Sequence, residues 1–438
     1  MKRRLFVLSA VISLLAWIVL IPSPILGQGN TWAGTSLAQM VEAARLRVGA
    51  FRVNASLTLT NAGYDTDVYY GYFDEAVPDF TLSAAVPVQV LLPLGKKIVL
   101  DLFESPQYLF YLDTRNERAW NNVFRGQIHF ALKRFYLQAG GGLSNISQRL
   151  SPELNVNIRQ KEDSLNGTLL WQASREISLA YIYGAAKYDY GDAEFGGASL
   201  AETLNRKENY FDFITYFQPS SRVRIFVDGQ FGTYTFLEAA SSFKDTRSLG
   251  VFGGFEFIPR QGETRQVSGL QGSIILGYKH FDIIAPQLAD GSGLVGVVNI
   301  SAGLLKRTMG RASFSQDFQF SVFSSATYYT LMIYGGGITH FLSKRASISY
   351  DLSFGRSTYP EAEMGGGVIP GGDTRYTTHL LSLDIRLSPD LRVAFLCTLG
   401  KRILIEGGLA SNRNFFGFNL IYGFSAAQIS APVNGLSR

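Results

Sequence analysis

Residues 311–322, which read RASFSQDFQFSV, decide the fold. Polar side chains take every second position from Arg311 to Ser321, and the positions between them are apolar except for Gln316. Successive side chains of a β-strand point to opposite faces, so this alternation predicts a strand between a wet side and an apolar side. The same period of two recurs at 97–102, 155–159 and 383–387, and it dominates the chain from residue 47 to residue 425.

Strands of this kind can be placed along almost the whole chain. We expect 18 of them, an even number that is typical of bacterial membrane barrels, and 16 is the second choice. Their expected positions are 48–60, 79–92, 97–111, 120–132, 134–146, 155–173, 175–190, 205–218, 220–237, 244–258, 268–282, 293–306, 310–323, 328–341, 344–358, 374–388, 391–404 and 413–425.

The connections between these strands alternate between long and short. Long segments such as 61–78, 189–204 and 359–373 are separated by tight turns such as 93–96 and 133–134. Outer-membrane barrels have long outward loops and short periplasmic turns, so the alternation predicts an orientation as well as a barrel. Two connections break the rule: 259–267 is long on the short side, and 324–327 is short on the long side.

The composition favours the same fold. The chain has 45 Gly, 32 Phe and 22 Tyr, and only 17% of its residues are charged, whereas a soluble domain usually carries about a quarter charged residues. No segment beyond the N-terminus is apolar for the roughly 20 residues that a membrane helix needs. We therefore predict an all-β, antiparallel, up-and-down transmembrane β-barrel with a lipid-facing exterior and a polar interior.

Aromatic side chains gather at several predicted strand ends. Tyr64 and Phe73 bracket one such group, Tyr188 and Tyr190 form another, and Tyr328 and Tyr329 a third. Rings of this kind sit well at the level of lipid headgroups. The alternative is a platform on which sugars stack at the mouth of a channel.

The N-terminal residues 1–27 have the pattern of a cleaved signal peptide. A basic start, Lys2 to Arg4, precedes an apolar stretch over 5–21, and Gly27 offers a small residue at the cut. An uncleaved anchor helix is the alternative. The remaining organisation is expected to be a periplasmic N-terminal segment at 28–46 with a short helix at 37–46, the barrel at 47–425 and a C-terminal tail at 426–438. The expected location is the bacterial outer membrane.

Charge and cysteine content exclude several classes of partner and cofactor. The formal charge is +5, of which three charges lie in the predicted leader, and the remaining +2 gives no argument for nucleic acid. The single cysteine, Cys397, provides neither a disulfide framework nor a cysteine metal site. We expect no cofactor and no metal.

Charged side chains on the polar faces of the predicted strands are the candidate site. They could form a selectivity surface along a water-filled path, because rings of charge set ion preference in pores. Mutual salt bridges in a wet interior are the alternative. The residues expected to line the lumen are Asp101, Arg159, Lys161, Arg222, Arg224, Asp228, Arg311, Asp317, Asp384 and Arg386.

Catalytic patterns are scarce. His280 and Asp282 are the one His/Asp pair spaced to lie on one strand face, where the imidazole could be oriented for chemistry. An ordinary polar pair at the lumen or rim is the alternative. No Gly-x-Ser-x-Gly elbow occurs, and no His or carboxylate cluster has metal-ligand spacing. We therefore predict that the protein is not an enzyme.

Several short motifs resemble those of the β-barrel porin 2 family. The opening strand 45–49 with 62–68, the strand start 204–209, the turn 217–223 and the hairpin 253–257 with 268–278 carry the resemblance. Two features depart from the family: the usual Asp-x-Asn reads Asp65-Thr66-Asp67, and 14 residues follow Phe424, where the closing aromatic usually ends the chain. The resemblance implies association with exopolysaccharide synthesis and export, and it supplies no catalytic residues.

Three functions are compatible with these observations. The first is a channel or scaffold linked to exopolysaccharide export, the second is a general diffusion porin, and the third is a barrel enzyme that acts on lipid or glycan. The expected partners are outer-membrane lipid, the outer-membrane assembly machinery and polysaccharide-export components.

Overall fold

A computed structural model describes residues 33–69, 76–149, 157–195, 198–258, 269–285, 290–323, 326–359, 373–405 and 409–423. Its elements are α2 (Ala33–Glu42), β1 (Leu46–Val48), β2 (Phe51–Asp65), β3 (Asp79–Ala85), β4 (Val88–Leu94), β5 (Ile98–Tyr111), η1 (Arg115–Glu117), β6 (Ala119–Ala131), β7 (Phe135–Gln148), β8 (Ile158–Gln172), β9 (Ile177–Tyr190), β10 (Glu194–Phe195), β11 (Ala198–Ser199), α3 (Leu200–Leu204), β12 (Arg206–Ser220), β13 (Val223–Phe236), η2 (Ala239–Lys244), β14 (Thr246–Phe257), β15 (Gln271–Ile283), β16 (Gly291–Leu305), β17 (Thr308–Phe320), β18 (Tyr328–Phe341), β19 (Ala346–Thr358), β20 (Thr374–Arg386), β21 (Leu391–Leu404) and β22 (Ala410–Gly423).

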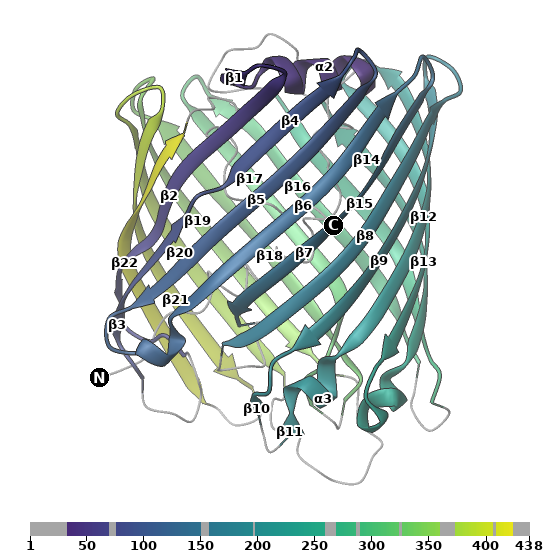
Figure 1. Cartoon of the computed structure of the whole chain (residues 1–438). Helices are drawn as coiled ribbons and strands as arrows, with labels where there is room; N and C mark the ends of the chain where they lie inside the picture. The colour runs from purple at the N-terminus through teal and green to yellow at the C-terminus, as the bar shows by residue number, and fades with distance from the viewer. Residues whose placement is uncertain are drawn as a thin grey trace.

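The strands form one closed antiparallel barrel (Figure 1). Each barrel strand pairs with the next barrel strand along the chain, with β9 followed by β12, and β2 pairs with β22 to close the cylinder. β1 pairs only with β2, and β10 and β11 form a separate hairpin. With β3 and β4 counted as one strand, the barrel has 18 strands, which confirms the predicted number.

β3 and β4 are one barrel strand interrupted by Pro87. Their register against β2 continues across the gap, from Thr58 opposite Ala85 to Ala55 opposite Val88. Pro87 has no N–H to give to the ladder, but its carbonyl still accepts a hydrogen bond from the N–H of Ser56 at 3.1 Å. The wall is therefore continuous at this point, although it lacks one hydrogen bond.

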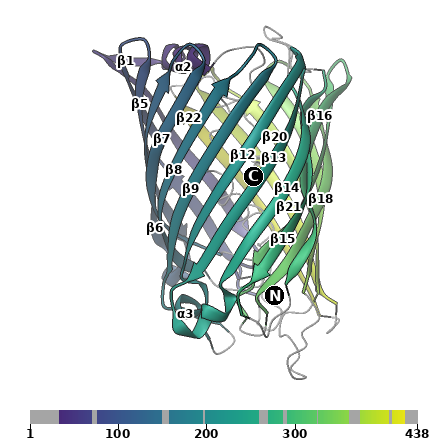
Figure 2. The same cartoon turned by 90° about the vertical axis from the view of Figure 1, so that its right-hand side faces the viewer.

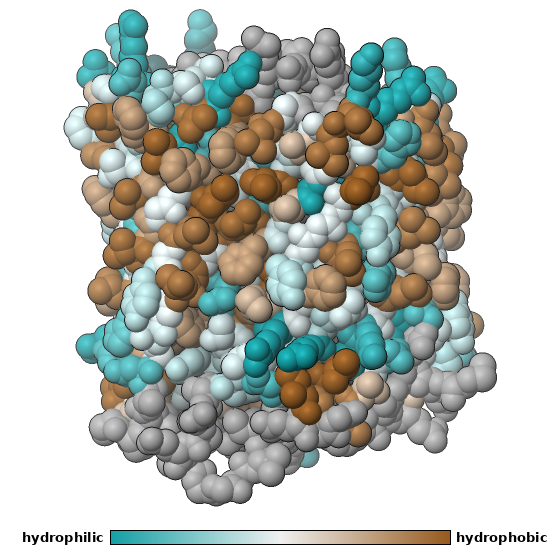
Figure 3. All heavy atoms as spheres, turned by 180° about the vertical axis from the view of Figure 1, so that it is seen from behind, coloured by the Kyte–Doolittle hydropathy of each residue, from teal (hydrophilic) through white to brown (hydrophobic). Residues whose placement is uncertain are grey.

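The outer surface carries the apolar band that a membrane-spanning barrel needs. Large hydrophobic side chains such as Trp120 and Leu294 are 66% and 72% exposed, and they alternate with buried or polar inward-facing positions along their strands. Figure 3 shows apolar side chains across the middle of one side of the barrel, with hydrophilic ones toward both rims.

The two ends of the barrel differ in their connections. Tight turns join most neighbouring strands at the end where α2 and β1 lie, whereas α3 lies at the opposite end (Figure 2). η1, the β10–β11 hairpin and η2 belong to the connections of that opposite end. We call these the short-turn end and the long-loop end. No helix in the described part of the chain is long and apolar enough to cross a membrane.

The seam between β2 and β22 contains an irregularity. The register shifts between Leu59 and Ala62, where Asn61 adopts a left-handed conformation with φ of 51°. Asparagine tolerates this conformation better than most residues. The Asn61 N–H donates to Asn419 Oδ1 at 2.9 Å, so a side chain of β22 completes the bulge.

Some predicted features lie outside the described residues. These are the leader at 1–27, the tail at 426–438 and the long turn at 259–267. The helix expected at 37–46 is α2, which begins earlier and ends at Glu42 because the chain turns into β1 at Leu46.

Candidate functional site in the barrel interior

The inner wall carries charges of both signs that pair across strands. Lys279 on β15 contacts Asp317 on β17 at 3.0 Å, Arg311 contacts Asp351 at 2.7 Å, and Arg392 contacts Asp384 at 2.5 Å. An ion pair also joins Arg224 of β13 to Glu256 of β14, and within β12 Arg206 pairs with Glu208. These pairs neutralise much of the wall, so the interior is mixed in charge rather than dominated by one sign.

Seven of the ten residues expected to line the lumen point inward. The exposed Val227 and Phe231 fix the outer face of β13, which places Arg224 and Asp228 on its inner face. Asp101 accepts hydrogen bonds from Gln89 Nε2 at 3.0 and 3.1 Å. The same alternation and cross-strand pairing place the remaining four inside: Arg311, Asp317, Asp384 and Arg386.

Arg159 and Lys161 do not line the lumen. Leu165, Leu169 and Trp171 are exposed on the same face of β8, so this face points outward. Arg159 Nε reaches across the outer face to Asn145 Oδ1 at 2.6 Å. The prediction was wrong here because polar residues occupy both faces of β8 at its long-loop end, where the outer wall is polar.

Arg222 also lies outside the inner wall. It is exposed in the turn between β12 and β13, and its carbonyl accepts a hydrogen bond from the N–H of Ile258. The predicted strand 220–237 begins too early, because Ser220 still belongs to β12, Ser221 and Arg222 form the turn, and β13 begins at Val223. Arg222 therefore belongs to the rim of the short-turn end.

An amphipathic helix covers part of the interior at the short-turn end. Leu37 of α2 is only 3% exposed and packs in a cluster with inward-facing side chains that include Leu91, Tyr136 and Ile214. Met40 and Val41 pack against the same cluster. These inward-facing side chains form an apolar belt on the inner wall, which is unusual beside a water-filled lumen. The belt is the surface against which α2 packs.

At the long-loop end, the β17–β18 hairpin leaves the wall and folds inward. Pairing of β17 with β16 stops at Gln316, whereas pairing with β18 continues to Phe320. Val322 and Phe323 then pack with Ile158 of β8 and Leu200 of α3, on a distant part of the wall. We call residues 317–323 and 326–329 the inner hairpin tip. The connection at 324–327 lies partly outside the described residues.

A buried lysine fastens the inner hairpin tip. Lys244, at the end of η2, is fully buried, and its Nζ donates to the carbonyls of Ser321 at 2.8 Å and Phe323 at 3.2 Å. Phe320 lies with its ring centroid 5.2 Å from that of Phe236, and the Arg206 guanidinium lies over the Phe320 ring at 5.4 Å. The tip is thus held by hydrogen bonds, aromatic packing and a cation–π contact.

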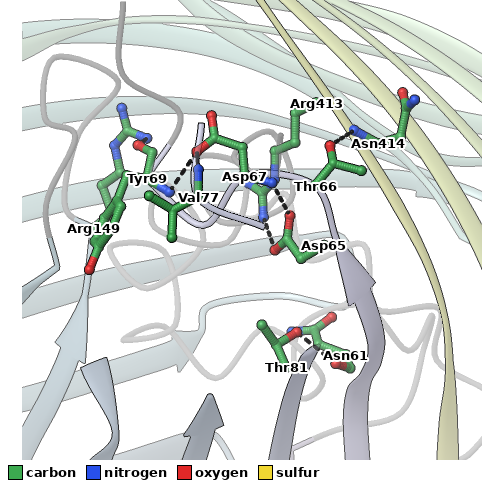
Figure 4. A network of polar contacts seen from close by, with 10 residues as sticks. All are labelled: Asn61, Asp65, Thr66, Asp67, Tyr69, Val77, Thr81, Arg149, Arg413 and Asn414. Atoms are coloured by element: carbon green, nitrogen blue, oxygen red, sulfur yellow. Dashed lines mark hydrogen bonds and ion pairs between the residues drawn. The ribbon is translucent and has the colours of Figure 1, made fainter. Parts of the chain in front are cut away.

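A second network orders the first long loop (Figure 4). Asp65 accepts a hydrogen bond from the N–H of Asp67 at 3.0 Å and pairs with Arg413 of β22 at 3.4 Å. Asp67 in turn accepts from the N–H groups of Tyr69 and Val77. The Asp65-Thr66-Asp67 motif therefore folds the loop onto the barrel seam.

The remaining candidate residues, for catalysis or metal binding, do not come together in a site within the described part of the chain. His280 and Asp282 lie on the outer face of β15, opposite Leu249 and Arg247, and no hydrogen bond joins them. Cys397 is a free thiol on the outer face of β21. Among the described residues, no group of His, Cys, Asp or Glu is placed to hold a metal ion.

No family model and no curated protein matches the chain. Similar solved structures include OpdO of Pseudomonas aeruginosa, which is 12% identical over 85% of this chain and 96% of its own, with a TM-score of 0.46. OccAB2 of Acinetobacter baumannii is 12% identical over 85% and 97%, with a TM-score of 0.47. The siderophore receptor PirA from the same species is 9% identical over 85% and 80%, with a TM-score of 0.42. At these values the likeness adds no argument about function.

Proposed function

We propose that the protein is an outer-membrane channel whose passage is narrowed from both ends. The observation that carries the proposal is the inner hairpin tip, which folds into the interior and is fastened there by Lys244. An 18-strand cylinder is wide enough for an aqueous channel. A tip folded across such a lumen would narrow the passage, so that only small hydrophilic solutes could pass.

The alternation of connections supports an orientation. Outer-membrane barrels place short turns in the periplasm, so the end with α2 would face the periplasm and the end with α3 would face outward. The outer apolar band supports a bilayer setting. Tyr188, Tyr190, Tyr328 and Tyr329, which were expected at headgroup level, are instead buried, with at most 7% exposure. The predicted leader supports export through the inner membrane.

Planar-bilayer recording tests this proposal. The refolded barrel should give discrete single-channel steps, and sugars of increasing size should reduce the current until they become too large to enter. A barrel that stays silent, both as the natural chain and with Leu37→Asp and Lys244→Ala combined, would contradict a channel, because these substitutions release both narrowing elements.

Exopolysaccharide export is the biological setting that the family resemblance favours. The stretch 62–68 carries part of the resemblance, although its Asp65-Thr66-Asp67 departs from the family's Asp-x-Asn. Asp65 in this stretch pairs with Arg413 of β22. Deleting the gene should reduce surface polysaccharide, and restoring it should recover the polymer. Unchanged polysaccharide in the deletion strain would separate the channel from this process and leave general diffusion as its role.

A further inference from the structure

The rim of the short-turn end is strongly basic. Six of its turns carry ten exposed cations and one acidic residue, Glu176. The β20–β21 turn carries one further acidic residue, Asp390, which pairs with Arg45. None of the ten takes part in an ion pair among the described residues. The cations are Lys96, Lys97, Lys133, Arg134, Arg175, Arg222, Lys306, Arg307, Lys344 and Arg345. Such a concentration of unpaired charge calls for an anionic partner.

Four of these turns share a second feature. Each contains two adjacent cations and is led by an outward-facing leucine one or two residues earlier. The exposed fractions of these leucines range from 37% to 58%: Leu94 51%, Leu132 37%, Leu304 58% and Leu342 50%. Leu94, Leu132 and Leu342 continue the outward-facing alternation of their strands. Leu304 lies at a register shift of β16, and its side chain lies beside Gly310 on the outer face of β17. The four leucines therefore point to the side of the barrel that faces lipid.

An exposed leucine next to two cations fits the boundary between hydrocarbon and headgroups. The leucine can enter the acyl region, while the long stems of Lys and Arg carry their charges outward to the phosphates. Basic residues near an anionic membrane surface are attracted to it electrostatically. A soluble acidic protein or a polyanion in the lumen would contact the cations but would leave the outward leucines without a role.

We propose that the short-turn rim binds anionic glycerophospholipid through its headgroup phosphate, at the four leucine-led dibasic turns. The partner lies in the leaflet that surrounds the short turns, and the contact is independent of whether the lumen conducts. The turns are distributed around the mouth, from the β4–β5 connection to the β18–β19 connection, so several lipids would bind to one barrel.

Native mass spectrometry of the barrel released from nanodiscs tests this proposal. The nanodiscs contain equal amounts of phosphatidylcholine and phosphatidylglycerol, and the retained lipids are counted for each barrel. We expect the natural chain to retain several-fold more phosphatidylglycerol than phosphatidylcholine. Changing all eight cations of the four turns to Gln should bring the two lipids to equal retention.

Two further variants test the role of the leucines. Lys344→Gln with Arg345→Gln removes two charges from a leucine-led turn, and Arg175→Gln with Arg222→Gln removes two charges from turns that no leucine precedes. We expect the first pair to lose more phosphatidylglycerol. Changing Leu94, Leu132, Leu304 and Leu342 to Ser, with all cations kept, should also reduce retention.

Two results would overturn the proposal. One is equal phosphatidylglycerol retention by the natural chain and by the two-charge variant at Lys344 and Arg345. The other is loss of soluble polygalacturonate binding in the eight-site variant while lipid retention is unchanged, which would assign the rim to a polyanion. Heat-modified gel mobility shows which variants are folded, and the two-charge variants carry the test if the eight-site variant does not fold.

Discussion

The elements that narrow the two ends of the barrel are held in place by different kinds of contact. At the short-turn end, an aliphatic helix covers an apolar belt and the cations are left exposed at the rim. At the long-loop end, the connections that the structure describes contain ten acidic and four basic side chains, and buried polar contacts hold them together. One end is therefore narrowed by hydrophobic packing, whereas the other adds buried ion pairs and hydrogen bonds to its apolar contacts.

The sharpest test of this difference compares one ion pair from each end. Arg413→Met leaves the Asp65 carboxylate buried with 1% side-chain exposure, and removing one partner of a buried pair costs about 3–5 kcal/mol. Arg392→Met breaks a pair with Asp384 that is 20–24% exposed, and we expect about 0.2–1 kcal/mol. Urea unfolding in detergent measures both, and equal losses would remove the distinction.

The inner hairpin tip provides the next largest effect. Lys244→Ala removes a buried charged donor from the carbonyls of Ser321 and Phe323, at a cost of about 1.5–3 kcal/mol. Release of the tip should raise single-channel conductance. Lys306→Ala, which removes an exposed cation from a short turn, serves as the control and should change neither quantity. An unchanged conductance in Lys244→Ala would show that the tip does not narrow the passage.

The helix at the opposite mouth can be released separately. Leu37→Asp places a charge on the buried face of α2 and forfeits about 1.5–3 kcal/mol of apolar burial. We expect α2 to leave the apolar belt, and conductance should rise. Gln39→Asp adds the same charge on the exposed face and should leave the current unchanged. If both variants conduct equally, α2 does not cover the pathway.

The smallest expected effect concerns ion selectivity. Arg386 points inward at the end of β20, whereas Arg222 lies in a turn at the rim. Arg386→Gln should shift the reversal potential in a salt gradient toward cation preference. Arg222→Gln should cause a smaller shift, because its charge lies farther from the passage. The reverse order would mean that the rim and not the wall sets selectivity.

The sequence predicted the barrel well where a strand crosses the apolar layer. There, one face must be apolar and the other polar. The alternation around Arg224 and Asp228 therefore predicts both the strand and the face that points into the barrel. The number of strands could be predicted because every strand that crosses the apolar layer shows the same alternation. The alternation failed at Arg159 and Lys161, because beyond the apolar layer the outer wall is polar while Ile158 packs into an interior core.

The stretch 311–322 shows the limit of such patterns most clearly. Arg311 to Gln316 alternate as the fold requires, but the alternating residues from Asp317 onward leave the wall. Phe318 and Phe320, which the pattern turned toward lipid, instead pack against Phe281 of the inner face. A local period of two fixes a strand, but only contacts with distant residues such as Lys244 decide where the end of that strand goes.

The seam between β2 and β22 has a consequence for the order of events during assembly. Asp65 and Arg413 are 348 residues apart in the chain, and bringing such distant ends together costs about 5 kcal/mol of loop-closure entropy. Contacts at the seam can offset that cost only after the last strand, β22, has reached β2. A barrel missing β22 would therefore remain an open, curled sheet with two unpaired edges, and the pairing of Asp65 with Arg413 would mark the moment at which the cylinder becomes complete.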